Sequence, residues 1–187
     1  MPDTDQWPFV KAKWFTPVDG KRKVRVIVIH DMEAPETPST AENVAKYFQV
    51  ITRPASAHIC VDSDSIVQCV WDNNVAFAAP GVNHDGIHIE LAGYAIQDGA
   101  AWLDPYGVLM LDRAANAVAQ YCRKYNLPCT KLTPKQLKAG AKGIIGHRDA
   151  TAVYKPNAGH QDPGGNFPWE WFIKRSNEHL ARLKGLI

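Results

Sequence analysis

Two histidines and one aspartate occupy segments that can direct their side chains into one cleft. His30 ends the apolar, β-branched segment VRVIVIH, and His147 ends the segment KGIIGH. Asp162 lies in the segment GHQDPGGNFPWEW, where prolines limit the backbone and glycines permit dihedral angles that other residues avoid. Two imidazoles and one carboxylate match the protein ligands of a catalytic zinc site, which keeps one position open for water. Zinc lowers the pKa of such a water to about 7, which makes hydroxide available at neutral pH.

An accidental grouping is the alternative for these three residues. The chain has seven histidines and 19 acidic residues, so three of them can fall at segment ends without forming a site. The sequence contains no compact His-Glu-x-x-His or Cys-x-x-Cys motif. The spacing alone therefore leaves both interpretations open.

Hydrolysis also requires a base and a group that stabilises a developing negative charge. Glu90 lies inside the apolar segment GIHIELAG, where burial would raise its pKa towards a useful range; the alternative is an edge-strand glutamate that faces solvent. His160 lies two residues before Asp162 and can donate to an oxyanion, or it is a loop histidine in water. His88 shares a strand face with Glu90 and is expected to approach the same site.

The elements that must position these residues alternate between strands and helices. Their order predicts a single α/β domain with a central mixed β-sheet flanked by helices. Ser39 and Glu42 predict a capping box at the start of the first helix, and the stretch between His147 and the last helix is expected to be a long loop. Strands are predicted at 24–30, 56–61, 65–71, 86–93 and 142–147, and helices at 38–50, 108–125, 133–140 and 168–184.

The first 21 residues are expected to form an N-terminal arm that packs on a catalytic domain spanning residues 22–187. Four aromatic residues are its expected anchors: Trp7, Phe9, Trp14 and Phe15. No linker, repeat or low-complexity tract divides the chain, so one domain is predicted.

Composition excludes several classes of protein. The chain has 187 residues, 45% of them hydrophobic, and a formal net charge of +2, which is typical of a globular domain. The sequence has no block of Lys and Arg residues that would indicate nucleic-acid binding. It also has no apolar run long enough to insert into a membrane. The N-terminus lacks a secretory signal pattern, so synthesis and folding in a cytoplasm are expected. The four cysteines are interpreted as buried free thiols, with a disulfide or metal role as the alternative.

Five segments occur together in the order found in one enzyme family. VIVIH, SAHICVDSDSIVQCV, GIHIELAG, GHRD and HQDPGGNFPW resemble the zinc-dependent N-acetylmuramoyl-L-alanine amidases of type 2. The resemblance covers about residues 22–175. This family includes phage endolysins, bacterial cell-wall amidases, cytoplasmic amidases that recycle muropeptides, and animal peptidoglycan recognition proteins.

The resemblance implies roles for individual residues. His30, His147 and Asp162 would hold one zinc ion per chain, and Glu90 would be the catalytic glutamate. His160 occupies the place where many members have a lysine that stabilises the transition state.

Other positions concern the substrate groove and its support. Asn83 matches an asparagine near the peptide-binding groove, and His58 matches a recurrent histidine of structural role. The family often reads A-W-H-A-G where this chain has AFAAPG, so Phe77 replaces the usual aromatic residue, and His88 stands where many members have glycine. Both departures are expected near the groove. Asp149 is expected either to support the metal ligands or to cap a helix or turn.

The implied reaction is hydrolysis of the amide between N-acetylmuramic acid and L-alanine in peptidoglycan. A phage endolysin for host lysis is the first interpretation; it would be made in the host cytoplasm and act on the wall after the membrane is permeabilised. The alternatives are a cytoplasmic muropeptide-recycling amidase, a peptidoglycan-binding module without activity, and a protein with a purely structural zinc site. The expected partner is peptidoglycan or a muropeptide, and the expected state is a monomer.

Overall fold

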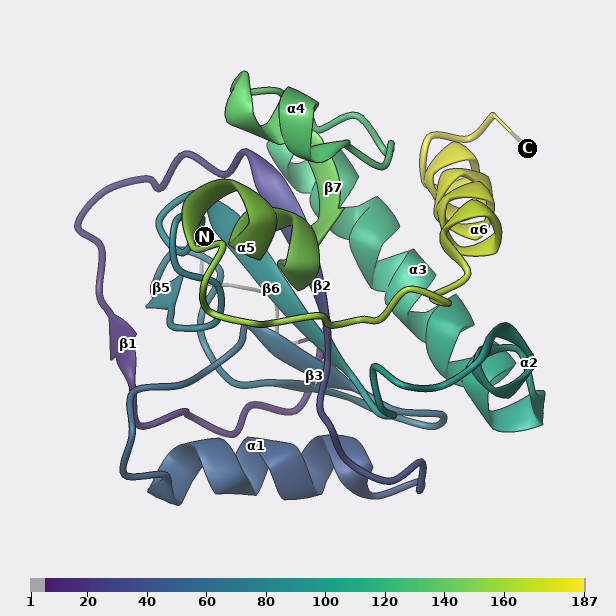
Figure 1. The fold of residues 1–187 in the computed structure, drawn as a ribbon, viewed down its shortest axis with the longest axis horizontal. Coiled ribbons are helices and arrows are strands. Elements are labelled where there is room, and N and C mark those ends of the chain that lie inside the picture. Colours follow the sequence, from purple (N-terminus) through teal and green to yellow (C-terminus); the bar gives the residue numbers. More distant parts are fainter. Residues whose placement is uncertain (1–5, 187) are drawn as a thin grey trace.

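A five-stranded mixed sheet forms the centre of the protein in the computed structural model, which describes residues 6–186 (Figure 1). The strand order is β4-β3-β6-β2-β7, and only the β3–β4 pair is antiparallel. The strands are β2 (Val26–Asp31), β3 (Ile59–Val61), β4 (Ile66–Gln68), β6 (Gly86–Leu91) and β7 (Gly143–Gly146). The predicted α/β domain with a central mixed sheet is therefore confirmed.

Helices cover both faces of this sheet. The helices are α1 (Thr40–Val50), α2 (Gly99–Trp102), α3 (Pro105–Tyr125), α4 (Pro134–Lys138), α5 (His147–Tyr154) and α6 (Trp169–Leu183). One face, which includes Ile27 and Ile29 of β2, packs in a large core with α3 and α6. On the other face Val26 and Val28 pack beside α4 and α5, whereas α1 covers β3 and β4. Because successive strand residues point to opposite faces, His30 lies on the face shared by α1 and α5.

Several local predictions differ from the structure. A long loop was predicted after His147, but the structure has helix α5 there. The Asp149 carboxylate accepts a hydrogen bond from the Gly146 N–H (2.8 Å) and caps that helix. The helix predicted from residue 108 begins three residues earlier, where the Asp104 side chain accepts from the Gly107 N–H. The short helix α2 was not predicted.

The predicted capping box of the first helix is wrong. Ser39 makes no side-chain cap. The carboxylate of Asp62, 21 residues away, instead accepts a hydrogen bond from the Ala41 N–H (2.9 Å). A contact from the β3–β4 turn thus replaces the local one.

The segment before β2 lies along β4 at the edge of the sheet. Backbone hydrogen bonds join Pro8 and Val10 to Gln68, each at 2.8 Å, and Phe9 stacks on Trp71 with ring centroids 3.9 Å apart. A small antiparallel pair, β1 (Phe15–Thr16) with β5 (Val75–Ala76), continues this contact. Residues 1–5 of the predicted arm lie outside the described residues.

The structure also bears on the predictions about the cysteines and about membrane-spanning segments. All four cysteines are free and buried, as predicted. Within residues 6–186, no helix combines the length and apolar character needed to cross a membrane.

Candidate metal centre and catalytic groove

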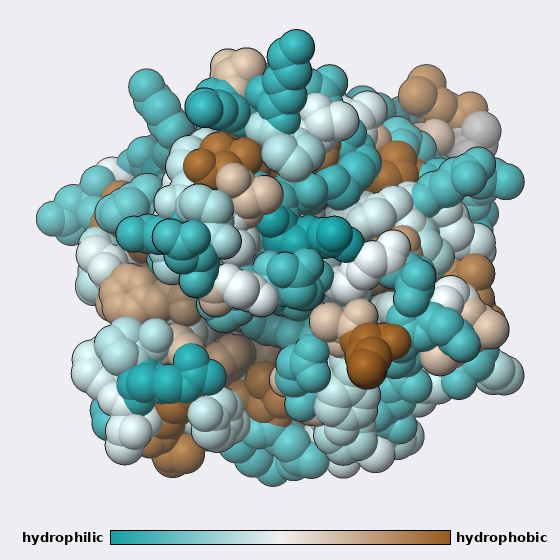
Figure 2. Space-filling model, viewed as in Figure 1, coloured by the Kyte–Doolittle hydropathy of each residue, from teal (hydrophilic) through white to brown (hydrophobic). Residues whose placement is uncertain are grey.

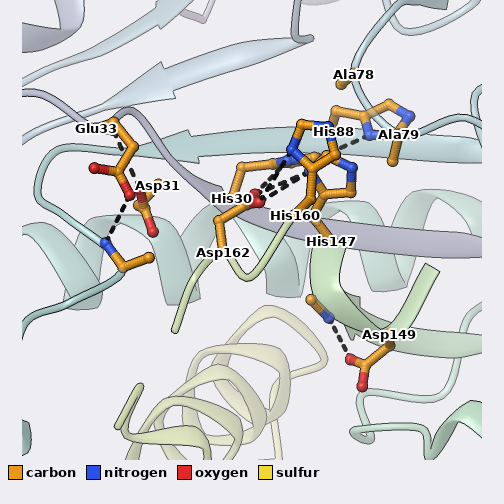
Figure 3. Close-up of polar contacts among 12 residues, drawn as sticks. His30, Asp31, Glu33, Ala78, Ala79, His88, His147, Asp149, His160 and Asp162 are labelled. Carbon is orange, nitrogen blue, oxygen red and sulfur yellow. Dashed lines mark hydrogen bonds and ion pairs between the residues drawn. The ribbon is translucent and has the colours of Figure 1, made fainter. Parts of the chain in front are cut away.

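The side chains of His30, His147 and Asp162 point toward one another (Figure 3), in a cavity that α1 and α5 help to line. One ligand atom from each lies within 4.8 Å of the others. The Asp162 Oδ2 atom is 2.9 Å from His30 Nδ1 and 3.1 Å from His147 Nδ1. His30 comes from the end of β2, His147 is the first residue of α5, and Asp162 lies in the loop before α6. The three residues singled out in the sequence therefore form one cluster.

The loop that carries Asp162 is held on both sides of that residue. The Asp162 carbonyl accepts a hydrogen bond from the Arg148 N–H (3.0 Å). Gly164 has a φ of +93°, and a Cβ atom there would collide with the Ala95 carbonyl. Phe167 is buried in the core, and its ring meets that of Trp102 edge-on, with the ring centroids 5.2 Å apart. Glycine is thus required for the close approach, and the aromatic anchor fixes the loop from its far end.

The pKa shifts of His30 and Asp162 favour the binding of a divalent metal. Burial lowers the pKa of His30, which favours the neutral imidazole. Burial alone would raise the pKa of Asp162, but hydrogen bonds from His147 and His30 outweigh it and hold that pKa below its ordinary value. Neutral imidazole and ionised carboxylate are the forms that bind metals. Two histidine nitrogens and one carboxylate oxygen match the ligand set of a catalytic zinc site, so the residues fit this ion.

Glu90 lies beside this cluster, on the neighbouring strand β6. It is paired in register with His30 of β2 and lines a cavity of about 690 Å³ together with His30, His147 and Asp162. Burial, followed by the negative charges of Asp162 and Asp31, raises the pKa of Glu90 well above its ordinary value. The raised pKa makes this carboxylate a stronger proton acceptor than an ordinary glutamate.

The walls of the cavity come from other parts of the chain. Phe77 lines it near Asn83, whose Oδ1 atom accepts hydrogen bonds from the N–H groups of Ala78 (3.2 Å) and Ala79 (2.7 Å). Figure 2 shows this face of the molecule, with hydrophilic side chains about its centre and apolar ones nearer α1. The apolar lining from α1 consists of Val44, Tyr47 and Phe48.

His160 lies at the mouth of the cavity. Its ring stacks on that of His147 with centroids 4.2 Å apart, and its Nδ1 atom is 4.0 Å from Asp162 Oδ1. The side chain is 52% exposed, so a group entering the cavity can contact it.

The structure corrects the expectation for His88 and decides between the two alternatives for Asp149. His88 does not reach the groove: its side chain is fully buried, and its Nδ1 atom lies 3.1 Å from His30 Nε2, behind the metal cluster. Asp149 makes no contact with His147 that would support a metal. Its carboxylate caps α5 and pairs with the Lys131 ammonium at 2.7 Å.

Asp31 was missed in the sequence. It follows His30 directly, lines the cavity and is 6% exposed, and its Oδ2 atom has no hydrogen-bond partner among the described residues. Burial raises its pKa to about 7. The signal was present, because an acidic residue directly after a strand-end ligand lies at the same edge of the sheet.

Comparisons with known proteins agree with this geometry. The family profile described as N-acetylmuramoyl-L-alanine amidase matches residues 20–165. No curated protein sequence matches the chain.

Solved structures share the fold. The hydrolase AmiA of Staphylococcus aureus has a TM-score of 0.70 at 19% identity, over 98% of this chain and 83% of its own. The endolysin amidase LysCS of Clostridium intestinale has a TM-score of 0.59 at 21% identity, over 93% and 97% of the two chains. AmpD has a TM-score of 0.60 at 18% identity, over 92% and 95%.

Proposed function

Since the chain belongs to the N-acetylmuramoyl-L-alanine amidase family and is a peptidoglycan amidase, we propose that its activity depends on one zinc ion held by His30, His147 and Asp162. The observation that carries this proposal is the approach of both Nδ1 atoms to one Asp162 carboxylate, with Glu90 on the adjacent strand. The scissile bond is the amide between N-acetylmuramic acid and L-alanine.

The chain's own residues then have distinct tasks. Bound zinc would supply a Lewis acid and a more acidic water. Glu90 accepts the proton of the attacking water and returns it to the amine of the leaving L-alanine. His160 donates an N–H to the oxygen that becomes negatively charged. Phe77 and Asn83 contribute to the wall that receives the stem peptide.

Digestion of purified sacculi tests this proposal. The zinc-loaded protein should release new L-alanine amino groups without new reducing sugars, and a chelator should abolish the release until zinc is restored. Glu90→Gln is the matched control, because it keeps the side-chain volume and removes the base. New reducing sugars, or release that a chelator does not affect, would contradict the proposal.

We also propose that this activity serves host lysis, as in a phage endolysin. The solvent-exposed position of His160 at the cavity mouth supports access by a polymer. A muropeptide-recycling amidase is the second candidate, and AmpD shares the fold. Parallel assays on sacculi and on soluble anhydromuropeptides separate the two: an endolysin cleaves intact sacculi efficiently, whereas a recycling enzyme prefers the soluble substrate. Binding to either substrate without cleavage would indicate a recognition module.

The proposed organisation is an N-terminal arm of residues 1–21 on a catalytic domain of residues 22–187. The contacts of Pro8, Phe9 and Val10 with β4 and Trp71 support it. We propose that the protein acts as a monomer, made in the cytoplasm and active on the wall after the membrane is permeabilised. Sedimentation of the purified protein tests the oligomeric state.

A further inference from the structure

We propose that His88 is a positioning residue for the metal ligand His30: when the metal is bound, His88 accepts a hydrogen bond from His30 Nε2–H and so keeps Nδ1 aimed at the metal. This inference rests on the zinc site proposed above. It concerns a histidine of this chain that stands where many members of the family have glycine.

The two ring nitrogens of His30 face different partners. Nδ1 lies 2.9 Å from Asp162 Oδ2, on the cavity side, and Nε2 lies 3.1 Å from His88 Nδ1, on the inner side (Figure 3). Without a metal, His30 Nδ1–H donates to Asp162. A metal bound at Nδ1 displaces that proton, and the neutral imidazole then carries its proton on Nε2. Because His30 is only 2% exposed, water does not readily supply an acceptor for that proton. His88 Nδ1 is the atom in place to accept it.

The His88 ring has no other hydrogen-bond partner among the described residues. Its Nε2 atom is buried without one, and the side chain has no exposed surface. An unsatisfied polar atom in the interior is destabilising. An apolar side chain would avoid this cost, so the contact with His30 is the feature that accounts for a histidine here.

His88 is itself held in a fixed orientation. Its ring stacks on the buried His58 ring, with an interplanar angle of 14°. The His88 backbone N–H donates to His58 Nδ1 (3.0 Å), and His58 Nε2 lies 3.0 Å from the Arg22 guanidinium and 3.2 Å from the Asn74 carbonyl. The support of the metal ligand therefore extends across β6 to β3.

Two variants of His88 test whether its side chain acts as a hydrogen-bond acceptor or only fills space. His88→Asn places an amide oxygen near the position of Nδ1 and keeps the acceptor, whereas His88→Leu keeps comparable volume without it. We expect His88→Leu to weaken zinc affinity by about 10- to 100-fold, the usual effect of losing such a partner. His88→Asn should stay within a few-fold of wild type. Affinity is measured by competition with a chelating indicator, and thermal unfolding of the metal-free proteins checks that both variants fold.

A spectroscopic measurement keeps the test independent of variant folding. Imidazole ¹⁵N NMR of the zinc-loaded wild type should show a proton on His30 Nε2 and none on His88 Nδ1. A protonated His88 Nδ1, or equal zinc affinity in wild type and His88→Leu, would overturn this inference while wild-type hydrolysis of sacculi leaves the proposed function intact. Failure of the wild type to bind zinc would overturn both.

Discussion

Glu90 and His30 occupy paired positions on the adjacent parallel strands β6 and β2. Strands in a sheet are about 4.8 Å apart, so the proposed base and a proposed metal ligand are separated by one strand spacing on the same face. This register is fixed by six backbone pairs along the two strands and does not depend on a mobile loop.

Removal of the Glu90 carboxylate should abolish turnover while leaving the metal site in place. Glu90→Gln is expected to lower kcat by about 10²- to 10⁴-fold, the usual contribution of a general base. Zinc affinity, measured by calorimetry, should change little, because Glu90 is not in the three-ligand cluster. A large loss of zinc binding would instead make Glu90 a ligand.

Zinc should stabilise the folded protein through Asp162. At a free zinc concentration about 100 times its Kd, the stabilisation is about 2.7 kcal/mol, and a chelator should remove it. Asp162→Asn should show little of this zinc-dependent rise in Tm. Asp64→Asn, which changes an exposed carboxylate in the β3–β4 turn, is the matched control and should respond as wild type does.

The exposed histidine at the cavity mouth should affect kcat more than metal binding. His160→Ala is expected to lower kcat by about 10²- to 10³-fold, as removal of an oxyanion donor does. His160→Lys restores a donor, so it should recover part of that loss. Steady-state kinetics on a soluble muropeptide measure both variants, and equal kcat in wild type and His160→Ala would remove the assigned role.

The contact between α3 and α6 should depend on pH through Asp112. Burial raises the pKa of this carboxyl group, but hydrogen bonds from Arg175 and His179 outweigh it and lower the pKa below its ordinary value. A lowered folded-state pKa means that the stabilisation is present above the ordinary carboxyl pKa of about 3.9. It is lost as pH falls below that value.

Asp112→Asn tests this dependence. Because the Asp112 side chain is 36% exposed, solvent screens the pair and the expected loss at pH 7 is about 0.5–1 kcal/mol. Urea unfolding of the metal-free proteins should show this difference at pH 7 and a smaller one near pH 3. A difference that stays constant would assign the effect to packing.

The aromatic contact of the N-terminal segment should contribute to stability. Phe9→Ala removes the stack on Trp71 and should lower the free energy of unfolding by about 1–2 kcal/mol. Leu109→Ala, at a side chain that is 58% exposed on α3, is the control and should change it by less than about 0.5 kcal/mol. Deletion of residues 1–13 should also expose the β4 edge and promote aggregation, which light scattering measures.

The sequence predicted those parts of the site that depend on local pattern. Strand ends and the constrained loop grouped His30, His147 and Asp162 as candidate ligands, and Glu90 was singled out as a carboxylate inside an apolar strand. Depth within the sheet is not a local property, so His88 was assigned to the groove although it lies beneath it. The capping box failed for a related reason, because Asp62 reaches the helix from a distant turn.

The reacting groups and the walls of the cavity come from two different sets of elements, and this separation bears on how the substrate specificity of the enzyme can change. The residues proposed for metal binding and proton transfer come from the ends of β2 and β6, the start of α5 and the Asp162 loop. The walls of the cavity come from α1 and the segment around Phe77. We therefore expect substitutions in the walls to alter which stem peptide is accepted without moving a proposed metal ligand. Tyr47, which is 48% exposed, and Phe77 are the positions from which to redirect the enzyme to a different peptidoglycan.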